Sequence, residues 1–364
     1  MTMSCTDSQG NTVGYGYDNE GNERRGQSLV LTISCTDSQG NTVGYGYDNE
    51  GNVTSVTYPG NKTVAYTYDG SNRLKTVTDW ASRVTTYTYD ATGRLDHVDR
   101  PNNTRQRVTF DAANRLTNSY EEKVSGGTVV ATLWQAGYGY DNANRLTSFT
   151  PNPMAQNNPP PTATMTFDSD NQLLSYNGQN VGHDADGNLS SAPVVSGTQL
   201  GALTWDARNR LTSAGGVTYS YDAENRRTRS VATGGTTTYI YSRGAKLDRL
   251  LVKQNPDGSV TRYIHGAGLL YEETTNAQGV AQSPVYYHYD WRGDTVALSD
   301  ATGNITARMS YSPYGVCTIE SGTVTTPFCF NGKWGVMTES SGLLSMQARY
   351  YSPVLQRFLN EDLT

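Results

Sequence analysis

The sequence predicts an all-β protein built from continuous antiparallel β-hairpin repeats that wind into a spiral sheet, hollow or open-ended. Three observations support this prediction. A short turn motif recurs along the 364 residues, β-branched and aromatic residues alternate between its copies, and 26 Tyr stand against 6 Phe. Charged residues make up only 17% of the chain, below the usual share of a globular protein. These features exclude a coiled coil or a helix bundle.

The repeated unit is an aromatic residue, Asp, two variable residues and then Gly or Asn, usually followed by Arg-Leu. Asp at a strand end can accept a hydrogen bond from the backbone N–H two residues on, and Gly or Asn tolerates the positive φ of a tight turn. The six clearest copies predict turn positions at Asp69 and Asn72, Asp90 and Gly93, Asp111 and Asn114, Asp141 and Asn144, Asp206 and Asn209, and Asp222 and Asn225. Looser copies centre on Asp18, Asp48, Asp168, Asp184, Asp290 and Asp300.

Strands are expected between the turns. Residues 63–68 alternate with period two, as a strand on a pleated surface does. The intervals from Asp48 to Asp69, Asp90 and Asp111 are 21 residues each, which suits one hairpin of two ordinary strands. Because an isolated hairpin is marginally stable, successive hairpins should pair edge to edge into one twisting sheet. Tyr and Thr on both faces predict a wall between two wet spaces rather than the dry centre of a sandwich.

Two features interrupt the repeats. Residues 4–22 recur unchanged as residues 34–52, so the hairpin at 1–33 is a recent copy or an artefact, and no function is assigned to it. Residues 151–163 hold five of the 13 prolines and are interpreted as a surface loop, with a ligand for a proline-recognition module as the alternative. The predicted segments are the duplicated hairpin at 1–33, a repeat wall at 34–260 with this Pro-rich insertion, and a C-terminal segment at 261–364.

The net charge and the lack of long apolar stretches argue against two kinds of partner, nucleic acid and a spanned membrane. The net charge of −6 gives no electrostatic reason to bind nucleic acid, so no nucleic-acid partner is expected. No apolar stretch approaches the ~18 residues that span a bilayer, and the polar N-terminus lacks the pattern of a secretion signal. We therefore expect no membrane span.

No catalytic residue, metal site or cofactor is predicted. The repeat carboxylates are assigned to turns. His97, His183, His265 and His288 show no metal-ligand spacing and are expected at solvated strand or turn positions. Arginines after the turns are expected to stack on Tyr or to pair with Asp across strands.

The four cysteines are too few for a disulfide scaffold and form no CxxC pair. Cys5 and Cys35 lie in the duplicated sequence, whereas Cys317 and Cys329 are twelve residues apart. Free thiols are expected, with a bridge between Cys317 and Cys329 left open.

The Tyr-Asp motifs resemble the YD repeats of the Rhs, insecticidal toxin-complex and teneurin superfamily. The C-terminal segment is similar to the Rhs repeat-associated core, whose signature is matched by Gly342, Leu343, Arg349, Tyr350, Tyr351, Pro353, Arg357 and Phe358. The resemblance implies a shell made from a spiral β-sheet, which in bacterial members encloses a C-terminal toxin until an aspartyl-protease-like activity frees it. This sequence has Gln356 where the family prefers Gly, and Asp362-Leu363 where it prefers Asp-Pro. Autoproteolysis is therefore not expected, although Glu361 and Asp362 occupy the approach to the family's cleavage region.

The leading hypothesis is a non-enzymatic β-shell, or shell fragment, of an Rhs-type polymorphic toxin system. Its partners would be a toxin effector absent from this chain and the delivery machinery. One alternative is a self-assembling extracellular fibre or tube, a homopolymer joined through open sheet edges. A second alternative is a carbohydrate-binding adhesin that uses rows of exposed Tyr. All three place the protein outside the cell or on its surface, by an export route that is not visible in the sequence.

Overall fold

The computed structural model describes residues 2–6, 12–16, 31–37, 39–153, 162–193, 200–242, 249–347 and 349–360, but not the side chains of 2–6, 12–16, 31–33 and 200. These residues form 33 strands and one short 3₁₀ helix, so the predicted all-β class is confirmed. Each strand within a sheet pairs with its neighbours in the sequence, and these pairings are antiparallel. No helix in the described ranges is long and apolar enough to cross a membrane.

The chain forms two long sheets and two short ones. The first long sheet consists of β1 (Thr2–Thr6), β2 (Thr12–Gly16), β3 (Leu31–Thr36), β4 (Thr42–Tyr47), β5 (Val53–Tyr58), β6 (Lys62–Tyr68), β7 (Leu74–Thr78), β8 (Val84–Tyr89), β9 (Leu95–Asp99), β10 (Thr104–Phe110), β11 (Leu116–Ser125), β12 (Thr128–Tyr140) and β13 (Leu146–Asn152). A short sheet of β14 (Met165–Phe167), β15 (Leu173–Tyr176) and β16 (Gln179–Asn180) follows.

The second long sheet consists of β17 (Ser191–Pro193), β18 (Leu200–Trp205), β19 (Leu211–Ala214), β20 (Val217–Tyr221), β21 (Arg227–Ala232), β22 (Gly235–Tyr241), β23 (Leu250–Gln254), β24 (Val260–Gly266), β25 (Gly268–Thr275), β26 (Val285–Tyr289), β27 (Thr295–Ser299), β28 (Ile305–Tyr311) and β29 (Cys317–Gly322). The 3₁₀ helix η1 (Gly332–Trp334) precedes the last sheet, which contains β30 (Met337–Thr338), β31 (Leu344–Met346), β32 (Arg349–Ser352) and β33 (Arg357–Phe358).

A β-bulge accompanies the repeat turns. In the hairpin of β6 and β7, Thr67 pairs with Thr76 but Tyr68 pairs with Leu74, so Lys75 is an extra residue. The same shift occurs at the aromatic residue of the copies at Tyr89, Phe110, Tyr140, Trp205 and Tyr221. A bulge increases the local right-handed twist of a strand pair. A bulge at the same place in each of these six copies therefore favours a sheet that winds instead of lying flat.

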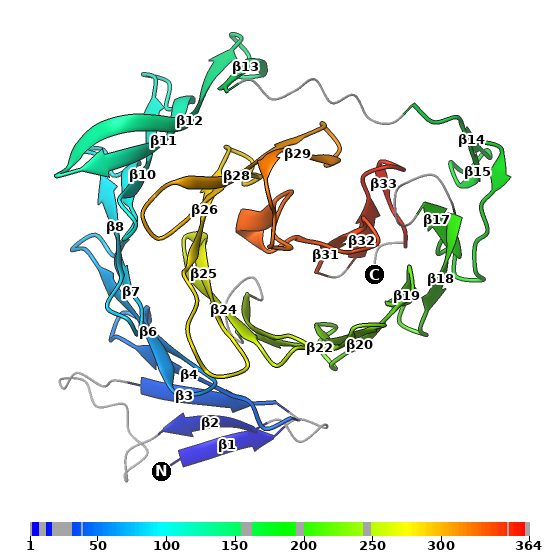
Figure 1. The fold of residues 1–364 in the computed structure, drawn as a ribbon, viewed down its shortest axis with the longest axis horizontal. Helices are drawn as coiled ribbons and strands as arrows, with labels where there is room; N and C mark the ends of the chain where they lie inside the picture. The colour runs from blue at the N-terminus through cyan, green and yellow to red at the C-terminus, as the bar shows by residue number, and fades with distance from the viewer. Residues whose placement is uncertain are drawn as a thin grey trace.

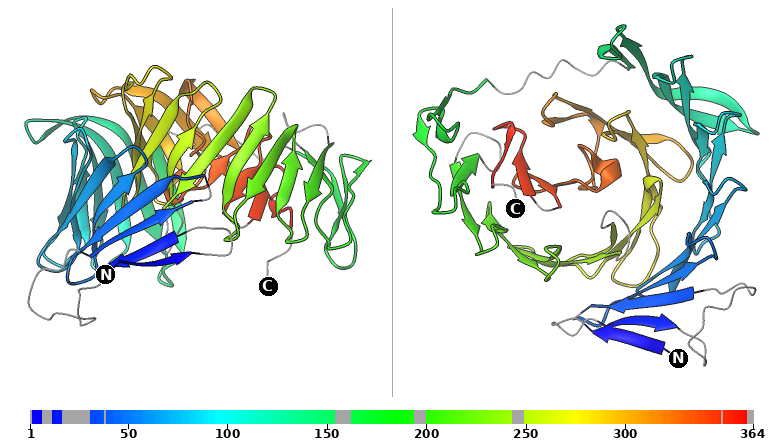
Figure 2. Two further views of the ribbon diagram at one scale, coloured as in Figure 1. Left: turned by 90° about the horizontal axis from the view of Figure 1, so that it is seen from below. Right: turned by 180° about the vertical axis from the view of Figure 1, so that it is seen from behind.

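The strands stand side by side around a spiral, as Figures 1 and 2 show. The first long sheet runs up one side, and the chain then passes β14–β16 and β17–β20 on the opposite side (Figure 1). The second long sheet returns along the inside of the first. We call β4–β12 the outer wall, β22–β28 the inner wall, and residues 323–360, which lie inside the spiral, the central segment.

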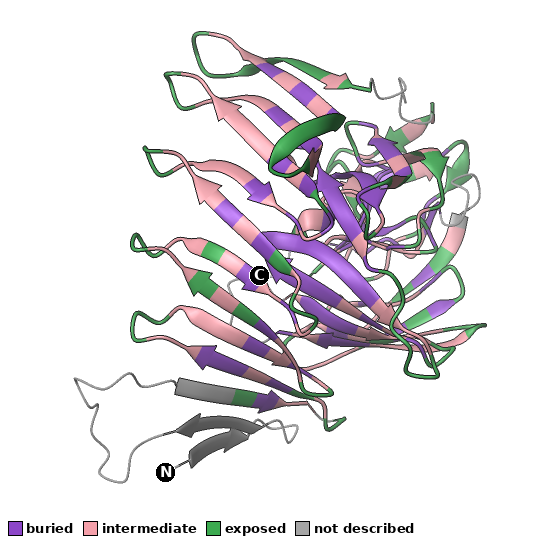
Figure 3. Cartoon of the chain, turned by 60° about the vertical axis from the view of Figure 1, so that its left-hand side comes forward, coloured by how far each residue is buried: buried purple, intermediate pink, exposed green. Residues whose placement is uncertain are grey.

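The two walls pack face to face around an apolar core. Val64 on the outer wall and Ile264 on the inner wall are fully buried in one cluster, which also contains Tyr58 and Tyr271. The expectation that neither face of the sheet is dry is therefore wrong here. It failed because the sheet covers itself: Val64 faces the inner wall, whereas Thr67 on the opposite face is exposed. Figure 3 shows the same contrast between buried strand centres and exposed turns.

The inner wall is buried on both faces because the central segment covers its second side. Tyr286 packs in the cluster between the walls. Its neighbour Tyr287 points the other way and packs in a cluster with Phe328 and Met337 of the central segment. Strands covered on both faces lose the alternation of buried and exposed residues. Accordingly, all five residues of β27 are buried.

The duplicated sequence folds as two hairpins of the same register. Cys5 pairs with Val13 in the first copy, and Cys35 pairs with Val43 in the second. The two copies adjoin, since β2 pairs with β3. Of the Pro-rich insertion, Pro151 belongs to β13, and residues 154–161 lie outside the described residues.

Candidate functional site: the repeat turns and the junction between the walls

Asp69 shows the geometry of the repeat turn. The N–H of Asp69 donates to the carbonyl of Arg73 (2.9 Å), and the N–H of Asn72 donates to the carbonyl of Asp69 (2.9 Å). The carboxylate Oδ1 accepts from the N–H groups of Ser71 (2.9 Å) and Arg73 (3.0 Å), and Asn72 has a φ of 63°. Asp90, Asp111, Asp141, Asp206 and Asp222 make the same contacts, and the residue three positions on has a positive φ in each turn: Gly93, Asn114, Asn144, Asn209 and Asn225.

The looser copies at Asp48, Asp168, Asp184, Asp290 and Asp300 also form such turns, whereas Asp18 lies outside the described residues. The motif missed further turns that begin at Asp37, Asp79, Arg100, Asn255, Asn276, Ser312 and Glu339. Many of these close the opposite end of a hairpin, where no aromatic residue precedes the turn. A search that required no aromatic residue before the Asp, and that allowed Ser three positions after it, would have found the turn from Asp79 to Ser82.

In several repeats the arginine after the turn links that repeat to the next. Arg94 pairs with the carboxylate of its own turn, at 2.7 Å between Nε and Oδ2 of Asp90, and not with an Asp across the strands. Its guanidinium lies 4.9 Å from the ring centroid of Phe110 and donates to Oδ1 of Asn114 (3.0 Å), both in the following repeat. Arg115 and Arg210 make equivalent contacts. This ladder fixes the spacing between successive turns.

The tyrosine of the motif links a repeat to the one before it. The hydroxyl of Tyr89 donates to the carbonyl of Leu74 (2.8 Å), and that of Tyr68 donates to the carbonyl of Val53 (2.9 Å). Trp205 uses its Nε1–H in the same way toward Leu189 (2.7 Å). A phenylalanine cannot make this bond. The contact therefore gives a physical reason for the excess of Tyr over Phe.

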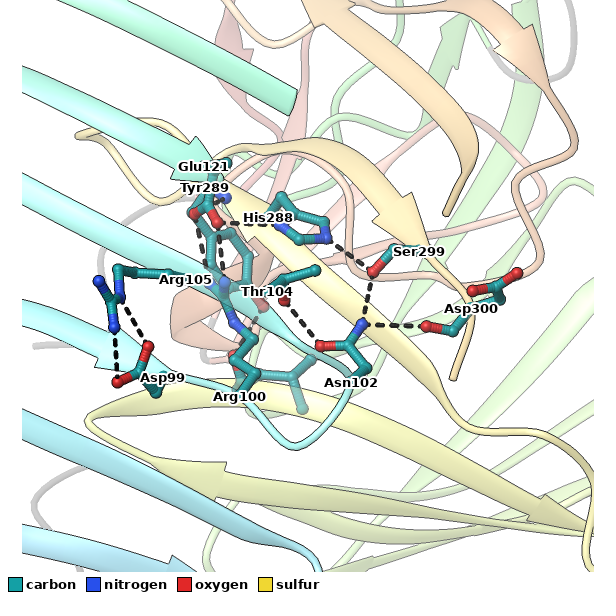
Figure 4. A network of polar contacts seen from close by, with 11 residues as sticks. Asp99, Arg100, Asn102, Thr104, Arg105, Glu121, His288, Tyr289, Ser299 and Asp300 are labelled. Atoms are coloured by element: carbon teal, nitrogen blue, oxygen red, sulfur yellow. Dashed lines mark hydrogen bonds and ion pairs between the residues drawn. The ribbon is translucent and has the colours of Figure 1, made fainter. Parts of the chain in front are cut away.

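The strongest polar feature is a buried network that joins the two walls (Figure 4). Arg100 follows β9 and makes a bidentate ion pair with Glu121 of β11, at 2.8 and 3.2 Å, with both side chains almost fully buried. Oε2 of Glu121 lies 2.9 Å from Nδ1 of His288 on β26, and Nε2 of His288 lies 2.8 Å from Oγ of Ser299 on β27. Asn102 of the outer wall donates to the same Oγ (2.9 Å). The loop between β9 and β10 and the strand β11 are thus tied to β26 and β27 of the inner wall.

The charges in this network follow from burial and neighbours. Burial would raise the pKa of the Glu121 carboxyl, but Arg100 and His288 hold it below its ordinary value. Burial lowers the pKa of His288 and outweighs the opposing effect of Glu121. His288 is therefore neutral at neutral pH, with its proton on Nδ1 facing the carboxylate and Nε2 accepting from Ser299. The prediction of solvated histidines is wrong for His288 and His265, both of which are buried.

A second set of polar contacts joins the turn between β7 and β8 to β25 of the inner wall. Asp79 pairs with Arg83 of its own turn (2.7 Å) and accepts from the hydroxyl of Tyr271 on the inner wall (3.0 Å). Arg83 also forms an ion pair with Glu273 of the inner wall, and Nε1 of Trp80 donates to the same glutamate (3.1 Å). The junction thus combines an apolar core with two buried sets of charges.

The residues of the C-terminal signature lie in the central segment. Gly342 ends the turn from Glu339 with a φ of 78°, and Leu343, Tyr350 and Pro353 are buried. The others form ring contacts: Arg349 lies 3.6 Å from the ring centroid of Phe358, which also packs on Tyr351, and Arg357 lies 4.7 Å from that of Phe167 in β14. Glu361 and Asp362 lie outside the described residues.

One buried arginine holds the central segment to the opposite side of the spiral. Arg227 at the start of β21 forms an ion pair with Glu339 and donates to the hydroxyl of Tyr350 (3.0 Å). The backbone adds a bond from the N–H of Leu189 to the carbonyl of Leu359 (2.9 Å). The last described strands are therefore fixed inside the spiral.

One cavity lies beside a pair of buried carboxylates. It measures about 270 Å³ between β12–β13 and β28–β29, and Asp290 and Arg292 line it. Burial and the nearby Asp290 raise the pKa of Asp294 to about 7. Both carboxylates accept hydrogen bonds from the backbone. Asp290 accepts from the N–H of Asp294 (2.9 Å), and Asp294 accepts from the N–H of Asn331 (2.8 Å). No group of three or more metal-ligating side chains occurs in the described part of the chain.

Sequence reasoning identified the turns but not Arg100, Glu121, Arg227 or Glu339. The adjacent acids Glu121 and Glu122 in the middle of a strand were the available signal, because a charge on a strand face that is otherwise apolar requires a partner. The partner itself could not be found from spacing, since His288 lies 167 residues away.

Comparison with known proteins agrees with this architecture. The teneurin YD-shell profile matches residues 117–364, and the RHS repeat profile matches residues 26–63, 50–84 and 68–105. The tRNA3(Ser)-specific nuclease WapA of Bacillus spizizenii is 28% identical over 206 residues, which are 55% of this chain and 8% of that protein. The tRNA nuclease WapA of Bacillus subtilis is 28% identical over 205 residues, with the same coverage.

Solved structures show the same fold. The crystal structure of TcdB2-TccC3 without its hypervariable C-terminal region superimposes with a TM-score of 0.62 at 16% identity, covering 98% of this chain and 22% of that one. The Tc holotoxin pore of Photorhabdus luminescens gives a TM-score of 0.63 at 16% identity, covering 99% and 22%. The chain thus spans about a fifth of these structures and less than a tenth of the curated relatives. Since the YD-shell match covers well over half of its residues, this chain belongs to the teneurin YD-shell family.

Proposed function

We propose that the chain is a structural, non-enzymatic wall of an exported Rhs-type toxin system, and that it encloses or scaffolds an effector. The observation that supports this most is the self-covering spiral. A sheet whose inner wall is packed on both faces is held as a rigid curved body. Buried polar groups at the junction oppose separation of the walls, because parting them would break the contacts of Glu121 with His288 and of Asn102 with Ser299.

The position of the central segment supports containment. Asn360, the last described residue, donates from Nδ2 to the carbonyl of Asn209, next to β19 (3.3 Å). The neighbouring β33 lies inside the spiral (Figure 1). A polypeptide that continued from this point would start on the inside, whereas β1 lies at the outer end of the first sheet.

The adhesin alternative has little support from the described side chains. Among the tyrosines whose burial is known, only Tyr314 exposes more than a third of its surface. Most of the others pack in the apolar clusters or bond to neighbouring repeats. A row of open rings for sugar stacking is therefore not present in this part of the chain.

Protection of a tethered peptide tests the proposal. A protease-sensitive, unstructured peptide is attached after Thr364 in one protein and before Met1 in a matched control. Containment predicts that the C-terminal peptide is cut several-fold more slowly than the N-terminal one by the same protease, while both proteins keep the same thermal midpoint. Equal rates of cleavage would reject containment. Negative-stain microscopy of the untagged chain should show discrete particles, and long filaments would favour assembly through open sheet edges instead.

A further inference from the structure

Two cysteines meet where β29 joins the inner end of the spiral. Cys317 begins β29 and pairs with Tyr311 of β28. The hydroxyl of Tyr311 donates to the carbonyl of Thr295 (2.7 Å), and the N–H of Thr295 donates to the carbonyl of Cys329 (2.9 Å). The backbone of Thr295 therefore bonds both to Cys329 and to Tyr311, the residue that pairs with Cys317.

The two side chains also lie close together. Both pack in the apolar cluster on the inner side of the inner wall, together with Phe328 and Met309. Each thiol shifts the pKa of the other, and no disulfide joins them. Cys329 is buried, whereas Cys317 is partly exposed.

We propose that Cys317 and Cys329 are a modification site that forms a reversible intramolecular disulfide. A small-molecule disulfide such as oxidised glutathione is the oxidant. It reacts with the thiol of Cys317, a partly exposed residue, to form a mixed disulfide, which the sulfur of Cys329 then attacks. One S–S bond forms within the chain, the S–S bond of the oxidant breaks, and the two thiol protons end on two molecules of reduced glutathione.

The electrostatics suit the second step. The neighbouring Cys317 lowers the pKa of Cys329 in spite of burial, which favours Cys329 as the thiolate that attacks the mixed disulfide. The neighbouring Cys329, together with burial, raises the pKa of Cys317, so the attack of Cys317 on the oxidant is the slower step.

The bond would close the loop of residues 317–329, which contains the whole of β29. Within the described residues β29 pairs with β28 alone, so one of its edges is open. A disulfide would fasten this strand to the chain beside β27 and η1. Such a bond persists in an oxidising exterior and is lost in a reducing cytosol. The end of the inner wall would thus be fastened outside the cell and released inside a reducing compartment.

Mass spectrometry of the full-length protein tests this directly. Trypsin releases residues 309–333 as one peptide, which contains Cys317 and Cys329 and no other cysteine. The protein is incubated with oxidised glutathione, free thiols are alkylated, and the peptide is measured before and after reduction. We expect the oxidised peptide to lack both alkyl groups and two hydrogen atoms, and to regain reactivity after reduction. The other two cysteines, Cys5 and Cys35, are the internal control and should stay alkylated.

Thermal unfolding supplies the second readout. Closing a loop of this length restricts the unfolded chain, so oxidation should raise the midpoint by several degrees. The rise should be absent in Cys317→Ser and in Cys329→Ser, and unchanged in a Cys5→Ser, Cys35→Ser background. Full alkylation of both thiols after oxidation, glutathione retained on Cys317, or a bond between two chains would each overturn the proposal. Because the first measurement uses the unaltered chain, it remains decisive even if a serine variant does not fold.

Discussion

Replacing Glu121 by Gln is the most direct test of the junction between the walls. The amide has nearly the shape of the carboxyl and can still accept one hydrogen bond, so packing is preserved. What it removes is the negative charge. Arg100, whose side chain is 3% exposed, then keeps its positive charge in the core without a counter-ion. Breaking a buried ion pair in this way typically costs about 3–5 kcal/mol.

The loss can be measured by urea denaturation followed through tryptophan fluorescence. Trp134 on β12 pairs directly with Glu121 on β11, so its emission reports on this part of the outer wall. We expect a lower urea midpoint with little change in the slope of the transition, because the surface exposed on unfolding stays the same. A double variant with Arg100→Met and Glu121→Gln removes the stranded cation and should recover more than half of the loss.

An exposed pair of the same chemistry provides the matched control. Arg145 pairs with Asp141 at 2.7 Å, but its side chain is 80% exposed. Solvent screens such a pair, so Arg145→Met should leave the urea midpoint within experimental error. The reasoning about the junction would be refuted if Glu121→Gln were as mild as this control, or if the double variant were no more stable than the single one.

Three further predictions concern stability. Burial lowers the pKa of His265 to about 3, below the ~6.5 of an unfolded histidine. Its contribution to the free energy of unfolding is therefore full above pH 6.5 and is lost as the pH falls. Between about pH 6 and pH 4 the free energy of unfolding of the wild type, measured by urea titration, should fall by about 1.4 kcal/mol more per pH unit than that of His265→Gln. Gln356 has a φ of 57°, so Gln356→Gly should raise the free energy of unfolding by about 1 kcal/mol and Gln356→Ala should not, by the same assay. Tyr89→Phe removes the 2.8 Å bond to Leu74 and should cost about 1 kcal/mol in calorimetry, whereas Tyr314→Phe at an exposed position should cost nothing.

The parts of the fold that could be predicted from the sequence are the local ones. Asp69 and Asn72 determine the turn through contacts within five residues, and the same chemistry recurs at each copy. Period-two alternation in residues 63–68 predicted the strand that the structure contains as β6. Pairing between consecutive strands follows from these two, since a hairpin places its strands side by side.

The contact between the walls could not be predicted, because nothing local to a repeat records it. Val64 and Tyr66 look alike in a strand that faces water and in one that faces another sheet. Only the burial of Val64 against Ile264, 200 residues later, distinguishes the two cases. His265 and His288 were misjudged for the same reason: their partners, the carbonyl of Leu250 and Glu121, belong to strands whose positions were unknown.

Residues of the turn motif and buried charged residues have different roles, and together they explain how a repetitive chain adopts a single arrangement of its walls. A sheet of identical hairpins could slide along itself by one repeat with little change in energy, since each turn offers the same contacts. The buried charges lie at positions that break the pattern: Arg100 begins a turn where Asp would be usual, and Glu121 occupies a strand centre. Only one alignment of the walls brings that carboxylate to His288, so any other would leave buried polar groups on both walls without these hydrogen bonds. The turn motif therefore determines the sheet and its twist. The residues that depart from the motif determine how the outer and inner walls align.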